Sequence, residues 1–191
     1  LTSRGLGDVY KRQIIMRIKT YFLLLTISLG YTNAQKWETP LIDGYGEVKY
    51  FKKTAIQPNP SSQYKLLFDI KDQTKKNGVN KGLWVIARTL NMLSLGKVPR
   101  NNIEIVASIH GEASFLALTD QAFQNKFGKS NPNLDLIDKL ISNGVKLFVC
   151  SQATAARGID EKSINKKIKR AFSGLSVLAT YQLNGYILMP Y

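Results

Sequence analysis

Apolar runs of strand length alternate along the chain with segments whose apolar residues have helical spacing. The strand-like runs are residues 64–70, 103–109 and 145–150, with weaker ones at 168–172 and 186–189. The segments with helical spacing are residues 81–95, 113–127, 134–142 and 174–183. Because the strands are apolar throughout, both faces of their sheet need a cover of helices. The pattern therefore predicts a three-layer α/β/α domain with a mainly parallel sheet of about five strands.

The N-terminal residues have the pattern of segments that precede the folded protein. Residues 1–15 resemble translated adapter or vector sequence, and we expect that they are not native. Residues 16–34 have the order of a signal peptide: Met16, two basic residues, the apolar run 21–29 and small residues up to Ala34. That run is too short for a membrane span, which needs about 20 apolar residues. We therefore predict export, to the periplasm or by secretion, with cleavage after Ala34 and no stable membrane insertion afterwards. An amphipathic or buried N-terminal helix is the alternative.

Residues 35–62 are irregular and rich in proline, glycine and aromatic residues, so we expect an N-terminal arm ahead of one domain at 63–191. Residues 35–191 carry 22 basic and 12 acidic side chains, a net charge of +10. An exported protein rarely meets nucleic acid. We therefore expect partners such as small anions, anionic lipid or cell-wall polymers, and no nucleic acid. A solvated basic face is the simpler explanation of the charge.

Cys150 is the only cysteine of the chain, and it ends the apolar run 145–150. A stretch of small residues with helical character, 152–157, follows at once. The thiol is therefore predicted to lie at the carboxyl edge of the sheet, where ligands bind in open α/β folds. The amides and dipole of a helix start favour a thiolate there. In the alternative, Cys150 is a small buried apolar residue, although polar Ser151 and Gln152 follow it.

The only histidine, His110, also follows a strand-like run directly, and Gly111 comes next. If the two strands are neighbours, the imidazole and the thiol of Cys150 can approach one another. The imidazole would then deprotonate or orient the thiol. The alternative is a structural histidine that is hydrogen-bonded to a loop carbonyl.

Several other kinds of site lack the residues that they need. One cysteine and one histidine fall short of the three or four ligands of a zinc site, so we expect no metal. No glycine-rich phosphate loop lies between a strand and a helix, and we expect no cofactor. No nucleophile elbow of the form G-x-S-x-G occurs, which argues against a Ser-His-Asp triad.

The order and spacing of five short motifs resemble the DsrE/DsrF-like family, over residues 64–191. The motifs are His110-Gly111, Asn131-Pro132-Asn133 and residues 144–150, 157–159 and 182–187. The resemblance implies a DsrE-like fold of the flavodoxin-like kind and an association with sulfur relay. It also implies a cysteine that accepts sulfane sulfur as a persulfide and passes it on. Cys150 occupies that position.

We therefore expect an exported sulfur carrier or sulfurtransferase-like protein in which Cys150 and His110 are the catalytic residues. Its substrate would be a small sulfur-containing anion or the sulfur of a partner sulfur-transfer protein. The residues expected to bind it are Gly111, Ser151, Gln152 and Arg157. One alternative is a non-enzymatic module that binds a small anion or a protein, with Cys150 lining the pocket. A redox sensor working through Cys150 is another, although the chain has no second cysteine.

The family also implies a homo-oligomer. Large apolar residues gather at 181–191, and the arm carries aromatic residues. Exposed groups of this kind usually mark an interface. We expect the interface to lie near the carboxyl edge of the sheet and to shelter Cys150. In the alternative, the arm folds back over its own domain.

Overall fold

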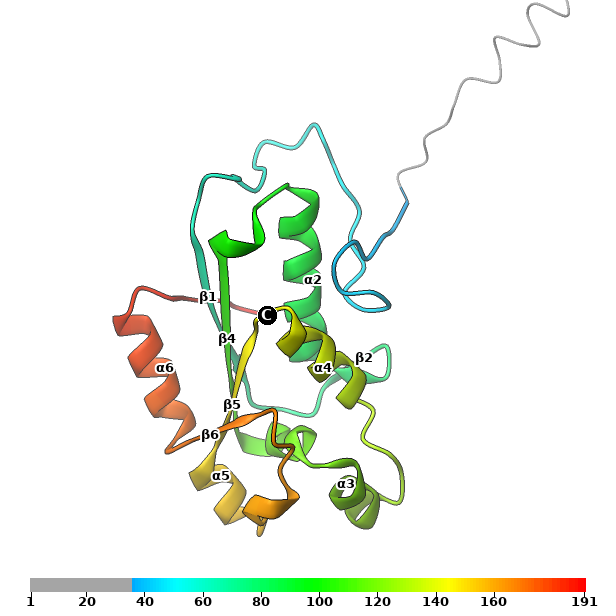
Figure 1. Cartoon of the computed structure of the whole chain (residues 1–191), viewed down its shortest axis with the longest axis vertical. Coiled ribbons are helices and arrows are strands. Elements are labelled where there is room, and N and C mark those ends of the chain that lie inside the picture. The colour runs from blue at the N-terminus through cyan, green and yellow to red at the C-terminus, as the bar shows by residue number, and fades with distance from the viewer. Residues whose placement is uncertain (1–35) are drawn as a thin grey trace, which may run out of the picture. The chain divides into compact units, whose positions relative to one another are not determined.

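Five parallel strands form one sheet in the order β6-β5-β4-β1-β7 (Figure 1). The computed structural model describes residues 36–191, so the predicted adapter segment and signal peptide lie outside the described residues. The strands are β1 (Tyr64–Ile70), β4 (Ile103–Ile109), β5 (Lys146–Cys150), β6 (Lys169–Ala171) and β7 (Ile187–Leu188). The predicted α/β fold with a mainly parallel sheet of about five strands is confirmed.

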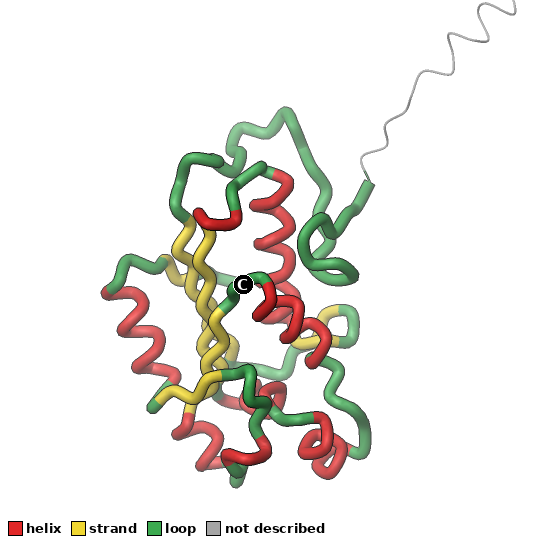
Figure 2. The backbone as a smooth tube through the Cα atoms, viewed as in Figure 1, coloured by secondary structure: helices red, strands yellow, loops and turns green. Residues whose placement is uncertain are grey.

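Helices cover both faces of this sheet, and Figure 2 shows the strands as the middle layer. Helices α2 (Lys81–Leu95) and α4 (Leu134–Ser142) pack on one face, where their apolar side chains join those of the central strands in the larger core. Helix α6 (Gly174–Leu183) packs on the other face, over Leu67 and Val106. Within residues 36–191, no helix has the length and apolar character that a membrane crossing requires.

The predicted helix 113–127 is wrong as a single element. The structure has a 3₁₀ helix, η2 (Gly111–Ala117), and then a separate helix, α3 (Asp120–Phe127). Leu118 between them is extended and forms an isolated bridge with Ile164. Thr119 then caps α3 through its hydroxyl, which accepts a hydrogen bond from the Ala122 amide at 3.2 Å. A distant strand-like contact and a local cap thus divide a segment whose apolar spacing is continuous.

Short elements connect the main ones. Residues 71–80, which connect β1 to α2, contain a small hairpin whose turn residues, Asn77 and Gly78, both have positive φ, as a type I′ turn requires. The short elements are β2 (Lys75–Lys76), β3 (Val79–Asn80), α5 (Ser151–Ala156), η1 (Arg100–Asn102) and η3 (Glu161–Ser163).

The N-terminal arm contributes to the core, which we did not expect of it. Ile42 is fully buried, and Val48 is also buried. The side chain of Asn91 in α2 fixes the arm: its Oδ1 accepts hydrogen bonds from the Leu41 and Ile42 amides, and its Nδ2 donates to two arm carbonyls. Asn91 is fully buried, and these four bonds satisfy it. This part of the arm therefore folds back over its own domain.

Candidate functional site

Three neighbouring strands carry polar side chains to the same place at the carboxyl edge of the sheet. Asp69 lies near the end of β1, His110 follows β4, and Cys150 ends β5. Ile109 pairs with Val149, so one further step along both strands sets His110 beside Cys150. Because side chains alternate along a strand, all three residues lie on the face that α6 covers. The strands of His110 and Cys150 are thus neighbours, as an approach of thiol and imidazole requires.

Cys150 is the N-cap of helix α5. Its sulfur accepts a hydrogen bond from the Ala153 amide at 3.3 Å, which satisfies one of the free amides of the first helical turn. An amide that points at the sulfur stabilises negative charge on it. Cys150 is only 5% exposed. The cysteine therefore stands at the predicted edge but beneath the surface.

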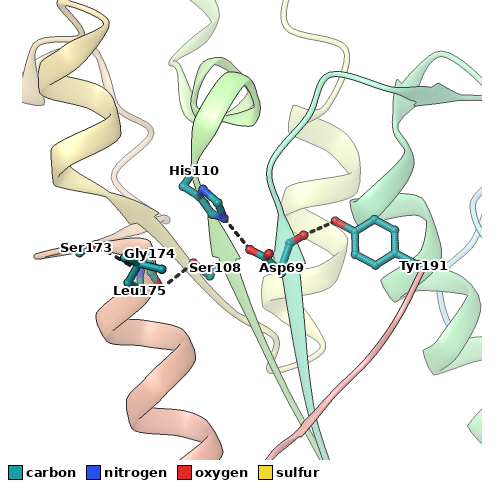
Figure 3. A network of polar contacts seen from close by, with 7 residues as sticks. All are labelled: Asp69, Ser108, His110, Ser173, Gly174, Leu175 and Tyr191. Carbon is teal, nitrogen blue, oxygen red and sulfur yellow. Dashed lines mark hydrogen bonds and ion pairs between the residues drawn. The ribbon is translucent and has the colours of Figure 1, made fainter.

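The imidazole of His110 pairs with Asp69 (Figure 3). Its Nε2 lies 2.5 Å from Asp69 Oδ1, and both side chains are about three quarters buried, with exposures of 27% and 28%. The His110 amide donates to the Ile70 carbonyl at 2.9 Å, which extends the contact between β1 and β4 past the end of the strand. His110 is thus held by a carboxylate, and within residues 36–191 no loop carbonyl is hydrogen-bonded to its ring.

Two glycines allow the chain to approach this site closely. A Cβ on Gly174, the first residue of α6, would lie 3.1 Å from His110 Cγ and Cδ2 and equally close to Ser108 Oγ. Ser108 Oγ donates to the Gly174 carbonyl at 3.2 Å, which holds this helix start against β4. Gly111 has φ +56°, and a Cβ there would come within 2.6 Å of the Lys71 carbonyl oxygen. The structure therefore gives Gly111 a backbone role beside the histidine.

Arg157 lies at the far end of α5 and binds an acidic residue that follows His110. Its Nη2 donates to Glu112 Oε1 at 2.8 Å, and its Nη1 donates to the Ala153 carbonyl at 3.2 Å. The Nε is buried and has no hydrogen-bond partner among residues 36–191. In this arrangement Arg157 links α5 to η2.

The two residues after Cys150 occupy the first turn of α5. Ser151 is half-buried, and its carbonyl accepts the Thr154 hydroxyl. Gln152 is exposed, and its Nε2 donates to the Phe172 carbonyl at 3.4 Å, so it reaches the loop between β6 and α6. The side chains of Cys150, Ser151 and Gln152 thus lie together at the start of α5, whereas the His110 ring is hydrogen-bonded to Asp69 in β1.

The last residues of the chain lie on the opposite side of Asp69. The Tyr191 hydroxyl donates to the Asp69 carbonyl at 2.8 Å (Figure 3). Burial, together with the nearby charges of Asp69 and Asp72, raises the pKa of Tyr191 above its usual value. An open groove of about 450 Å³ runs here, lined by Asp69, Lys71, Asp72 and residues 188–191. Asp69, which holds His110, forms part of its wall.

Three residues of this region escaped the sequence analysis: Asp69, Glu112 and Gly174. Asp69 had a detectable signal, because it is the one acidic residue in the apolar strand 64–70 and points to the same face as Leu67. The roles of Glu112 and Gly174 depend on how the loops fold, and the sequence alone does not indicate them. Among the described residues, no three His, Cys, Asp or Glu side chains stand close enough together to hold a metal ion.

Comparison with known proteins places most of the chain in one family. A model of the DsrE/DsrF-like family matches residues 57–191. The fold is similar to that of a protein of unknown function, MTH1491, from Methanobacterium thermoautotrophicum, with 21% identity and a TM-score of 0.49, over 66% of this chain and 97% of that one. It is also similar to the ychN protein from E. coli, with 15% identity and a TM-score of 0.45, over 67% and 99% of the two chains. No curated protein matches the sequence.

Proposed function

The chain belongs to the DsrE/DsrF-like family, and on this premise we propose that it is a sulfur carrier whose Cys150 accepts sulfane sulfur as a persulfide. The observation that carries the proposal is the position of the only thiol. Cys150 lies at the carboxyl edge of a parallel sheet, its sulfur accepts the Ala153 amide, and the strand of His110 runs beside it. These are the surroundings in which negative charge on sulfur is stabilised.

The chemistry is a nucleophilic substitution at sulfur. The Cys150 thiolate attacks the outer sulfur of a donor such as thiosulfate, and a new S–S bond forms on Cys150. The S–S bond of the donor breaks, and its electron pair leaves with sulfite. One proton is released from the thiol, and the product is a Cys150 persulfide anion. A second nucleophile then takes the outer sulfur and returns Cys150 to its thiolate.

Burial of Cys150 limits which donors reach it. With 5% of the residue exposed, a small anion or the narrow end of a partner's persulfide fits better than a bulky donor. The excess of 22 basic over 12 acidic residues in 35–191 also favours anionic donors. We keep export as part of the proposal, which excludes cytosolic acceptors, and we expect donor and acceptor to be small sulfur anions or another exported sulfur-transfer protein.

The test is to incubate the protein with a sulfur donor and to measure its intact mass. Residues 35–191, reduced and then incubated with thiosulfate or polysulfide, should gain about 32 Da, the mass of one sulfur atom, in an intact mass spectrum. Cys150→Ser, which keeps the size and a capping oxygen, should gain nothing. An absence of the adduct on a protein whose thiol titrates as free would overturn the proposal.

A second candidate function is a binding module in which Cys150 serves only the structure. The observation that favours it is the same burial, because the sulfur already caps α5 and Arg157 is already bound to Glu112. A binding module predicts that Cys150→Ser retains ligand binding and stability. The sulfur-loading test separates the two candidates, since only the carrier gains mass.

A further inference from the structure

We propose that Asp69 is a positioning residue that holds His110 in one tautomer, with the proton on Nε2 and a free lone pair on Nδ1. In this tautomer, His110 takes the proton that Cys150 loses when it attacks a sulfur donor. The inference deepens the proposed sulfur-carrier function and rests on it for the step that His110 serves. It assigns a role to a strand residue that belongs to none of the motifs found in the sequence.

The contact between Asp69 and His110 fixes the location of one proton. An ionised carboxylate only accepts hydrogen bonds, so the ring nitrogen that faces Asp69 Oδ1 at 2.5 Å must carry a hydrogen. Both side chains are shielded from water over most of their surface, which strengthens a charge-assisted bond of this kind. The neutral imidazole then has its lone pair on Nδ1, and residues 36–191 form no hydrogen bond to that atom.

The packing around the ring fixes the direction of that lone pair. Gly174 lies against Cγ and Cδ2, where a Cβ would stand only 3.1 Å from both atoms, so the lack of a side chain lets this helix start lie close to the ring. The Ser108 hydroxyl holds Gly174 in place through its carbonyl. Figure 3 shows the second ring nitrogen on the side turned away from both Asp69 and Gly174. A half-turn of the ring about the Cβ–Cγ bond would exchange Nε2 with Cε1 and so lose the hydrogen bond to Asp69.

The sheet register sets His110 beside the strand end that carries the thiol. His110 follows Ile109, which pairs with Val149, and Cys150 follows Val149 on the neighbouring strand. Other charged groups around this edge are Lys71 and Asp72 after β1, Glu112 in η2 and Arg157 at the end of α5. Glu112 and Arg157 neutralise each other, so His110 is the group at this edge best suited to take a proton.

The step moves one proton and exchanges one S–S bond for another. The proton of the Cys150 thiol moves to His110 Nδ1, and the sulfur forms its bond to the outer sulfur of thiosulfate. Sulfite leaves with the electron pair of the broken S–S bond. The resulting imidazolium, stabilised by Asp69, then gives its proton to sulfite or to water. Asp69 itself stays ionised throughout and touches no reacting atom.

The tautomer can be read directly, because His110 is the only histidine of the chain. Uniformly ¹⁵N-labelled protein without a histidine tag, at about pH 8 where an ordinary imidazole is neutral, gives one pair of ring nitrogens in long-range ¹H–¹⁵N spectra. We expect a protonated Nε2 and an unprotonated Nδ1. Asp69→Asn, which removes the charge at constant size, should give a mixture of tautomers, whereas the control Asp72→Asn should match the wild type. A protonated Nδ1 in the wild type, or an unchanged spectrum in Asp69→Asn, overturns the proposal.

Reaction rates supply the second measurement. The alkylation of Cys150 by iodoacetamide at pH 7 should slow about tenfold in Asp69→Asn, as in His110→Gln, and the double variant should be no slower than either. Additive losses would mean that Asp69 does not act through His110. This readout needs no sulfur donor. If the wild type alkylates as described but never gains sulfur, the carrier function fails while the assignment of Asp69 stands.

Discussion

Gly111→Ala tests how the chain turns after His110. Gly111 has φ +56°, a conformation that costs an alanine about 1 kcal/mol, and its new Cβ would come within 2.6 Å of the Lys71 carbonyl oxygen. That atom belongs to the backbone, so relief requires a shift of the chain between β1 and α2, at a further cost of about 2 kcal/mol. We expect a loss of about 3 kcal/mol in the free energy of unfolding.

Gly128→Ala is the matched control. Gly128 has φ +69° at the end of α3, and a Cβ there would meet nothing within 4 Å. It should lose only the conformational term, about 1 kcal/mol. Urea unfolding of the two variants, followed by circular dichroism, measures the difference of about 2 kcal/mol. Equal losses, within about 0.5 kcal/mol, would refute the close approach to Lys71. A stable Gly111→Ala protein that loads sulfur slowly would instead support the substrate-binding role first expected for Gly111.

Three further predictions concern access, assembly and alkaline stability. For each reagent, the rate of modification of Cys150 is divided by the rate at which the same reagent modifies glutathione. Because Cys150 is buried, this ratio should be at least about tenfold higher for iodoacetamide than for a bulky maleimide. Equal ratios would mean that the thiol is open to solvent. We expect light scattering at micromolar concentration to show a homo-oligomer. Leu175→Glu, at the exposed start of α6, should dissociate the oligomer, whereas Met92→Glu on α2 should not. A single-subunit mass for the wild type would contradict this prediction. The raised pKa of Tyr191 means that the folded state keeps this proton longer than the unfolded state, so stability should be full below pH 10 and fall above it. The free energy of unfolding of Tyr191→Phe, measured by urea melts at several pH values, should fall less steeply with pH than that of the wild type. An identical pH dependence would contradict the assignment.

The apolar pattern predicted the main elements because their burial is periodic. Strands β1 and β4 and helices α2, α4 and α6 have the bounds that the sequence indicated, and each places an apolar stripe or run against the sheet. The segment 113–127 failed because periodicity does not register a cap and a distant bridge, here Thr119 and the pairing of Leu118 with Ile164. The buried Ile42 was missed for a related reason: its contacts come from α2, about 50 positions away.

The candidate site was predictable where a residue ends a strand and unpredictable where loops meet. Cys150 and His110 stand out in the sequence, and the parallel order of β4 and β5 brings their strand ends together. The sequence did not identify Asp69 as the partner of His110, because a carboxylate within an apolar strand can bond to a residue of either neighbouring strand. The substrate-binding role of Arg157 stays a prediction, and its pairing with Glu112 depends on the path of η2, which the sequence does not indicate.

The most direct test of the sulfur-carrier account is transfer from the loaded protein. Reduced protein is loaded with polysulfide, freed of excess donor by gel filtration and mixed with cyanide, which removes a sulfane sulfur as thiocyanate and leaves the thiolate. The account predicts one thiocyanate per chain, recovery of a free Cys150 and no thiocyanate from Cys150→Ser. Equal thiocyanate from Cys150→Ser, or none from a wild-type protein treated in the same way, would contradict it.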